Sequence, residues 1–220
     1  DNSASNAAFN VRNGLLSPAA AIEYSFANVT KDIELLFEYP EDIQMFGLSF
    51  NTTTIRTGTA FSGEIAHFRN HPFQLHVGQV VPGLLNLTPP DHPGFPGGDY
   101  SPPYASDAYI SSWIELDKTQ ASMGVTQLFG PQLGASQVAV TLEGAYLHIH
   151  DMPDKDNVRL QTPGVALLQF GPQALFADAG SWGYRLAGVL TYSNVLGAFE
   201  VSPRVVFSHD VAGNSPAGQP

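Results

Sequence analysis

The sequence predicts an all-β protein, an antiparallel up-and-down transmembrane β-barrel of the outer-membrane type, and three observations carry this prediction. Hydrophobic residues make up 43% of the 220 residues and charged residues only 13%, which leaves much apolar surface with few charges to hydrate an aqueous exterior. The 21 Gly and 17 Pro interrupt the chain too often for long helices. Apolar and polar residues alternate along several segments, as they do in strands whose two faces meet different environments.

The charge balance and the missing residue types exclude several classes of protein. Nine Lys and Arg against 20 Asp and Glu give a net charge of -11, and such a chain repels a phosphate backbone, so no nucleic-acid partner is expected. Cysteine is absent, so disulfides and thiolate metal sites contribute nothing. No window of about 18 residues is continuously apolar, and the sequence therefore predicts no transmembrane helix.

The clearest strand signal is a hairpin near the C-terminus. The apolar positions of its two strands are Trp182, Tyr184, Leu186, Leu190 and Tyr192, then Phe199, Val201, Val205 and Phe207. Pairing of Tyr192 with Phe199 would place these side chains on one face and Arg185, Glu200 and Arg204 on the other. Each strand runs for about eleven residues, enough to cross a bilayer at a tilt, and aromatic residues lie at both ends of the apolar face.

The same alternation repeats in five upstream segments, so that about seven spans are expected. Their apolar positions are Ile22, Tyr24 and Phe26; Phe46, Leu48 and Phe50; Phe61 and Ile65; Met123 and Val125; and Val138, Val140, Leu142 and Tyr146. Polar residues, including Glu64 and Glu143, occupy intervening positions. Alternation alone does not separate a lipid-facing surface from a buried core, so a soluble β-sandwich is the structural alternative.

The connections between these segments alternate in length. Short connections are expected at 130–134 and 194–198, and long ones at 81–108 and 151–181. Outer-membrane barrels have short periplasmic turns and long outer loops, so this asymmetry favours the barrel over the sandwich. The long segments are predicted to form no β-ladders and to be external loops, because Pro, Gly and Asp cluster in them.

Five charged residues would line the lumen if the apolar face meets lipid. They are Arg185, Glu200, Arg204, Glu143 and Glu64. A wall of mixed charge can steer permeant ions, or its charges can pair across strands and brace the barrel. The sequence leaves both interpretations open.

His148 and His150 lie two residues apart beside Asp151, and imidazoles at that spacing can share a metal ion with a carboxylate. The motif lacks a third ligand, so these residues are weak metal candidates, and neither a metal nor another cofactor is predicted. No nucleophile and base share a strand face near the outer rim, so no enzymatic activity is predicted.

Several short segments resemble the domain-of-unknown-function 1302 family, large outer-membrane proteins of Gram-negative bacteria. These segments are Glu38–Ile43, Gly47–Phe50, Ser62–Ile65, Pro72–Leu75, Leu128–Pro131, Leu133–Ser136, His150–Asp154, Ser181–Leu186, Leu196–Gly197, Ser202–Arg204, Ser208–Asp210 and Gly213–Pro216. The resemblance covers the chain from about residue 38 to its end. It implies a location in the cell outer membrane and a part in moving hydrophobic compounds alongside inner-membrane exporters, and it supplies no catalytic residues.

Members of the family are longer, so residues 1–220 are expected to form a single β-barrel segment that is an incomplete part of a larger barrel. The leading functional hypothesis is a porin-like channel or transport component for small hydrophobic or amphipathic molecules, with segments 81–108 and 151–181 capturing or gating them. The expected partners are the lipid bilayer and lipopolysaccharide, a small hydrophobic ligand, and periplasmic or inner-membrane transporter proteins. The alternatives are a non-conducting surface scaffold or adhesin and a soluble β-sandwich binding module.

Overall fold

The fold is a single antiparallel β-sheet. The structure, a computed structural model, describes residues 36–76, 78, 80, 109–163, 165 and 173–216. Within them lie seven strands with antiparallel pairing throughout, and helical structure is limited to η1 (Gln173–Leu175), a 3-10 turn, and to Gly78 and Val80. No helix in these ranges is long and apolar enough to cross a membrane. The all-β antiparallel architecture is confirmed, whereas the sheet stays open over the described residues and a closed barrel remains a prediction.

The strands form an antiparallel meander. Their bounds are β1 (Gln44–Thr53), β2 (Ala60–Gln74), β3 (Trp113–Phe129), β4 (Gln137–Ile149), β5 (Gly180–Val195), β6 (Phe199–Val201) and β7 (Arg204–Ala212). Both β6 and β7 pair with β5, so they are one strand path interrupted at Ser202 and Pro203. Pro203 has no N–H to donate, which an edge strand tolerates, and its carbonyl accepts a hydrogen bond from Leu190 N–H at 3.1 Å. The predicted span at 22–26 lies outside the described residues.

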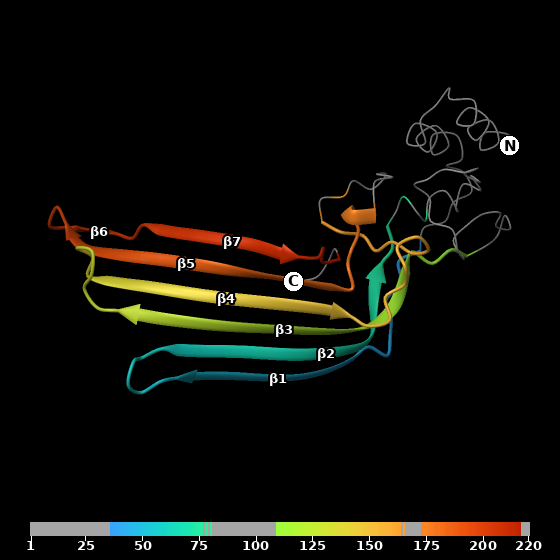
Figure 1. Cartoon of the computed structure of the whole chain (residues 1–220), viewed down its shortest axis with the longest axis horizontal. Coiled ribbons are helices and arrows are strands. Elements are labelled where there is room, and N and C mark those ends of the chain that lie inside the picture. Colours follow the sequence, from blue (N-terminus) through green and yellow to red (C-terminus); the bar gives the residue numbers. More distant parts are fainter. Residues whose placement is uncertain are drawn as a thin grey trace, which may run out of the picture.

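The tight turns all lie at one end of the sheet (Figure 1). They are residues 54–59 between β1 and β2, 130–136 between β3 and β4, and 196–198 between β5 and β6. The long connections, 75–112 and 150–179, leave and rejoin the sheet at the opposite end, which we call the loop end. The predicted alternation of short and long connections is confirmed, although segment 81–108 itself falls outside the described residues.

The predicted register of the C-terminal hairpin is wrong by two residues. Tyr192 pairs with Val201 rather than with Phe199, and further along the ladder Leu186 pairs with Phe207. The physical reason is the turn, which contains three residues with positive φ: Asn194 (60°), Leu196 (50°) and Gly197 (81°). Because of this left-handed backbone and the irregular pairing beside it, residues that the prediction placed in the ladder belong to the turn. A shift of two leaves every side chain on its predicted face.

The pairing aligns the two faces of all strands across the sheet. One row of cross-strand partners reads Thr52, Phe61, Val125, Leu142, Leu186 and Phe207. The adjacent row, which points to the other side, reads Asn51, Ser62, Gly124, Glu143, Arg185 and Ser208. Because cross-strand partners share a face, the sheet has one apolar face and one polar face, as the alternation predicted for these strands.

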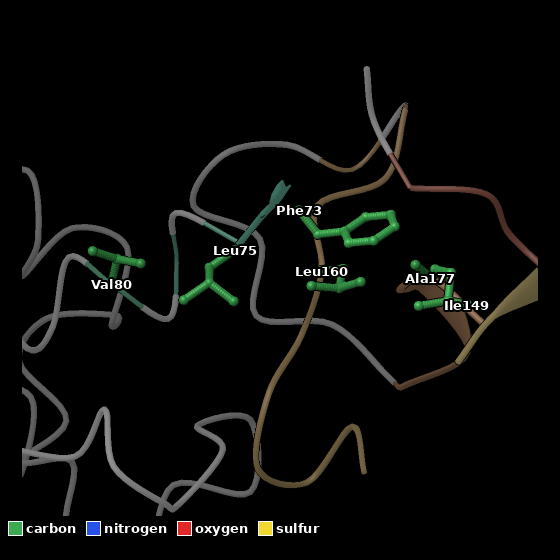
Figure 2. Close-up of a cluster of buried hydrophobic side chains, with 6 residues drawn as sticks. All are labelled: Phe73, Leu75, Val80, Ile149, Leu160 and Ala177. Carbon is green, nitrogen blue, oxygen red and sulfur yellow. The ribbon is translucent and has the colours of Figure 1, made fainter. Parts of the chain in front are cut away.

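The buried core lies at the loop end of the sheet. Figure 2 shows its side chains, which are Phe73, Leu75, Val80, Ile149, Leu160 and Ala177. Leu75 and Leu160 form an antiparallel bridge, flanked by a 2.8 Å hydrogen bond from His76 N–H to the Arg159 carbonyl. The prediction that segment 151–181 forms no ladder is therefore wrong, because burial of Leu160 brings its backbone against the end of β2.

Candidate functional site

The five charged residues predicted to line a lumen all lie on the polar face. Glu143 and Arg185 are direct cross-strand partners, and Glu64 and Arg204 occupy positions of the same face in β2 and β7. Glu200 precedes Val201, an apolar-face residue paired with Tyr192, and so points to the polar side. The structure thus brings these charges to one surface, while the role of that surface as a lumen wall remains a prediction.

The polar face is hollowed near the loop end. The hollow has a volume of about 780 Å³, and strands β2, β3, β4, β5 and β7 form its floor. Its rim is made by Thr162, Pro163, Asn214 and Ser215, from the β4–β5 connection and the segment after β7. Of the five predicted residues, those lining this hollow are Glu64, Glu143 and Arg185, whereas Arg204 lines a smaller neighbouring one of about 200 Å³.

Asp210 is a charged residue of the hollow that the sequence analysis missed. It pairs with Gly183 on the polar face, beside an irregularity in the ladder between β5 and β7. A Cβ atom on Gly183 would lie 2.8 Å from the His209 carbonyl oxygen, so glycine is required for this approach. The signal that could have found Asp210 was its position two residues after Ser208, at the spacing that keeps a strand residue on one face.

The charged side chains of the polar face do not neutralise one another. Across the described part of the chain, no ion pair joins Glu64, Glu143, Arg185 or Arg204 to any partner, although Glu143 and Arg185 face each other on adjacent strands. All four side chains are exposed. The cross-strand bracing considered from the sequence therefore has no contact to support it here, and the charges are accessible to a solute.

The rim of the hollow is held in place by Asp178. Its carboxylate accepts a 2.6 Å hydrogen bond from Lys155 Nζ and a 2.8 Å hydrogen bond from Asn214 N–H. The Asn214 side-chain amide donates to the Ala174 carbonyl at 2.7 Å. These contacts tie the segment after β7 to the β4–β5 connection, so both sides of the rim belong to one hydrogen-bonded unit.

The environment of Asp178 lowers its pKa below the ordinary value of 3.8. Burial acts to raise the pKa, but the hydrogen bonds from Lys155 and from Asn214 N–H, with the charge of Lys155, outweigh it. A carboxylate with a depressed pKa stabilises the folded state above its unfolded pKa, and this contribution is lost as the pH falls through the folded pKa. The rim should therefore be held by these contacts at neutral pH and should lose them as the pH falls below 3.8, the ordinary pKa of the carboxyl group.

Replacement Asp178→Asn is expected to destabilise the rim by about 1 kcal/mol at neutral pH, because it removes a partly exposed, charge-assisted contact. Hydrogen exchange at the Asn214 amide should be several-fold faster in the variant at pH 7, and the difference from the wild type should shrink as the pH falls below 3.8. Asp151→Asn, which changes an exposed carboxylate in the same connection, is the control. Unchanged exchange at Asn214 in Asp178→Asn at neutral pH would contradict the role given to this ion pair.

The weak metal candidates lie on the other side of the sheet from the hollow. The rings of His148 and His150 are 4.7 Å apart between centroids, and His150 Nε2 lies 2.8 Å from Thr119 Oγ1. His67, from β2, was missed by the sequence analysis, and its Nδ1 lies 3.0 Å from the same hydroxyl. Asp151 sits in an exposed turn with φ 51°. Among the residues described, no group of three or more His, Asp or Glu is placed to hold a metal ion.

Comparison with known proteins identifies a family. Residues 4–219 fit a family model described as "Protein of unknown function (DUF1302)". This range begins well before residue 38, where the resemblance seen in the sequence starts. No curated protein and no solved structure matches the chain.

Proposed function

Because the chain belongs to the DUF1302 family of proteins of unknown function, we propose that it forms part of the wall of an outer-membrane β-barrel that serves as a channel or transport component for small hydrophobic or amphipathic molecules. The observation that carries the proposal is the uncovered apolar face. Eleven of its large side chains are between 42% and 78% exposed. These side chains are Phe46, Leu48, Phe50, Ile65, Met123, Leu142, Tyr146, Trp182, Leu186, Val205 and Phe207. A continuous apolar surface of this kind requires a non-aqueous neighbour.

The dimensions of this face match a bilayer. From Trp182 to Tyr192 on β5 the apolar face extends over ten residue steps, which is about 34 Å of strand. At a tilt of roughly 40° the strand would cover about 26 Å along the membrane normal, close to the apolar band of outer-membrane barrels. Both end residues are aromatic, as at the membrane interfaces of such barrels.

The polar face supports an aqueous lumen on the opposite side. Glycine, serine, threonine and charged residues alternate with the apolar set along the same strands, and a barrel wall needs this division between lipid and water. Lipid and lipopolysaccharide would then cover the apolar face, and solutes would pass along Glu143, Arg185 and Arg204. We assign the protein no enzymatic role, and periplasmic or inner-membrane transporter proteins are its proposed partners.

A surface scaffold or adhesin is the second candidate, and one observation favours it. The β4–β5 connection packs Leu160, Phe176 and Ala177 into the core at the loop end instead of leaving the mouth of the sheet clear. A folded cap of this kind can present a binding surface to an external partner. The scaffold and the channel differ in whether the folded protein conducts ions.

The deciding experiment is single-channel recording of the full-length protein in planar bilayers, after a heat-modifiability gel has established that it folds in detergent. Arg204→Glu should shift selectivity toward cations, because a change of two charges at roughly 8 Å in water alters the energy of a passing ion by about 1 kcal/mol, or about fivefold in its rate. Arg69→Glu, on the opposite face, should leave selectivity unchanged.

Each other result has a defined meaning. A folded protein without conductance would support the scaffold function in place of the channel function. A protein that is soluble without detergent would support the β-sandwich fold in place of the β-barrel. Discrete conductance with unaltered selectivity in Arg204→Glu would remove this residue from the lumen wall.

A further inference from the structure

The hollow on the polar face carries an excess of negative charge. Its charged lining consists of the carboxylates Glu64, Glu143 and Asp210 and the guanidinium of Arg185, a formal charge of -2 at neutral pH. In the part of the chain that the structure describes, no ion pair neutralises any of them. An anionic solute would meet two surplus carboxylates, whereas a cationic solute would gain from them.

The floor of the hollow has the form of a trough across the strands. Glu64 and Asp210 lie in one cross-strand row, and the residues between them are Ser122, Ala145 and Gly183. Neighbouring strands are about 4.8 Å apart, so the two carboxylates are separated by about 19 Å measured along the sheet. The small side chains between them leave room for a molecule to lie against the sheet.

The hollow presents both polar and apolar groups to a solute. Serine hydroxyls and carboxylates line it through Ser62, Glu64 and Glu143. Leu147 and Pro163 add apolar surface. A solute with a charged head and an apolar body would therefore find complementary surface for both parts.

The rim gives the trough a fixed boundary. Thr162 and Pro163 follow the Leu75–Leu160 bridge, and Asn214 is held by Asp178. Both sides of the opening thus depend on contacts formed within this chain. A preorganised boundary lowers the ordering cost of binding.

We propose that this hollow binds small amphipathic amines, with the ammonium head at Glu64 or Glu143 and the apolar part along Ala145 and Leu147. The inference deepens the proposed channel function and rests on it, since it names the class of solute that the polar face takes up. Arg185 sets the strength of binding by partly cancelling the carboxylates, because it lies directly across from Glu143.

The test is calorimetric titration of the full-length protein in a non-ionic detergent with benzylammonium, a protonated primary amine with an apolar ring, and with benzenesulfonate as an anion of similar shape. The ammonium probe should bind and the sulfonate should not. The double variant Glu64→Gln and Glu143→Gln should weaken ammonium binding by about tenfold or more, because both head-group partners lose their charge. Glu115→Gln, an exposed residue of β3 whose odd position places it on the other side, should bind like the wild type.

A second variant keeps the test independent of any folding defect in the first. Arg185→Gln removes the positive charge and should strengthen ammonium binding several-fold, a gain that misfolding would not produce. Equal binding of both probes, or unchanged affinity in both variants, would overturn the proposal. Failure of the channel function would give a different result. If ammonium binding responds to the variants but the protein shows no conductance in planar bilayers, the binding site is supported and the pore is excluded.

Discussion

Replacement Leu186→Arg should cost about 2–4 kcal/mol of folding free energy in a bilayer, because it places a guanidinium at the middle of the proposed lipid-facing surface. Leu186 lies midway along β5 between the aromatic ends of the apolar face, and its cross-strand partners are Leu142 and Phe207. All three side chains are exposed within this chain, so no protein group is positioned to solvate the new charge. The quantity to measure is the free energy of unfolding from lipid vesicles in urea.

The adjacent residue provides the control. Ala187 pairs with Thr141 and Val206 on the polar face, so Ala187→Arg should change the unfolding free energy by less than about 1 kcal/mol. Tyr192→Arg, at the end of the apolar face, should also cost only about 0–1 kcal/mol, since the penalty falls toward the membrane interface. Equal losses at Leu186 and Ala187, or a loss at Tyr192 as large as that at Leu186, would contradict a lipid-facing surface.

Replacement Gly213→Ala is expected to produce the second large effect, a loss of roughly 2–3 kcal/mol or more from the rim of the hollow. Gly213 has φ 75°, a left-handed conformation that side chains disfavour. A Cβ at this position would overlap the Gly180 carbonyl oxygen and lie 2.9 Å from Ser181 Cα. These are backbone atoms of β5 and cannot rotate away, so the segment that carries Asn214 must move off the strand.

Hydrogen exchange at the Asn214 amide, together with urea unfolding, would measure this loss. Gly197→Ala is the matched control, because Gly197 also has positive φ, at 81°, but no atom lies within 4 Å of the position that its Cβ would take. It should therefore cost only the backbone strain, about 1 kcal/mol. Similar effects at the two glycines would mean that the close approach to Gly180 does not restrain the rim.

The strands themselves could be predicted from the sequence because their signal is local. A strand turns successive side chains to opposite faces, so Trp182, Leu186 and Tyr192 already indicate a common face within a short stretch of chain. The same local rule placed Glu64, Glu143 and Arg185 opposite the apolar set, and the pairing of β2 to β5 brings them to one surface as expected.

The register of the last hairpin could not be predicted in the same way. It depends on Leu196, whose positive φ is unusual for a leucine and gives no signal in the sequence. The error of two residues left the faces intact, since the side-chain period of a strand is also two. Alternation therefore fixes which residues share a face, but the turn fixes which residues are neighbours.

The hollow and the core were decided by the tertiary structure. Leu75 and Leu160 are far apart in sequence, and only the return of the β4–β5 connection to the end of β2 buries them together. The rim forms because Asp178 binds both Lys155 and Asn214, which come from different segments. The sequence by itself determined an all-β chain with one apolar and one polar face, through contacts between near neighbours. Where the polar face is hollowed and what borders it follow from contacts between distant segments, which no local period encodes.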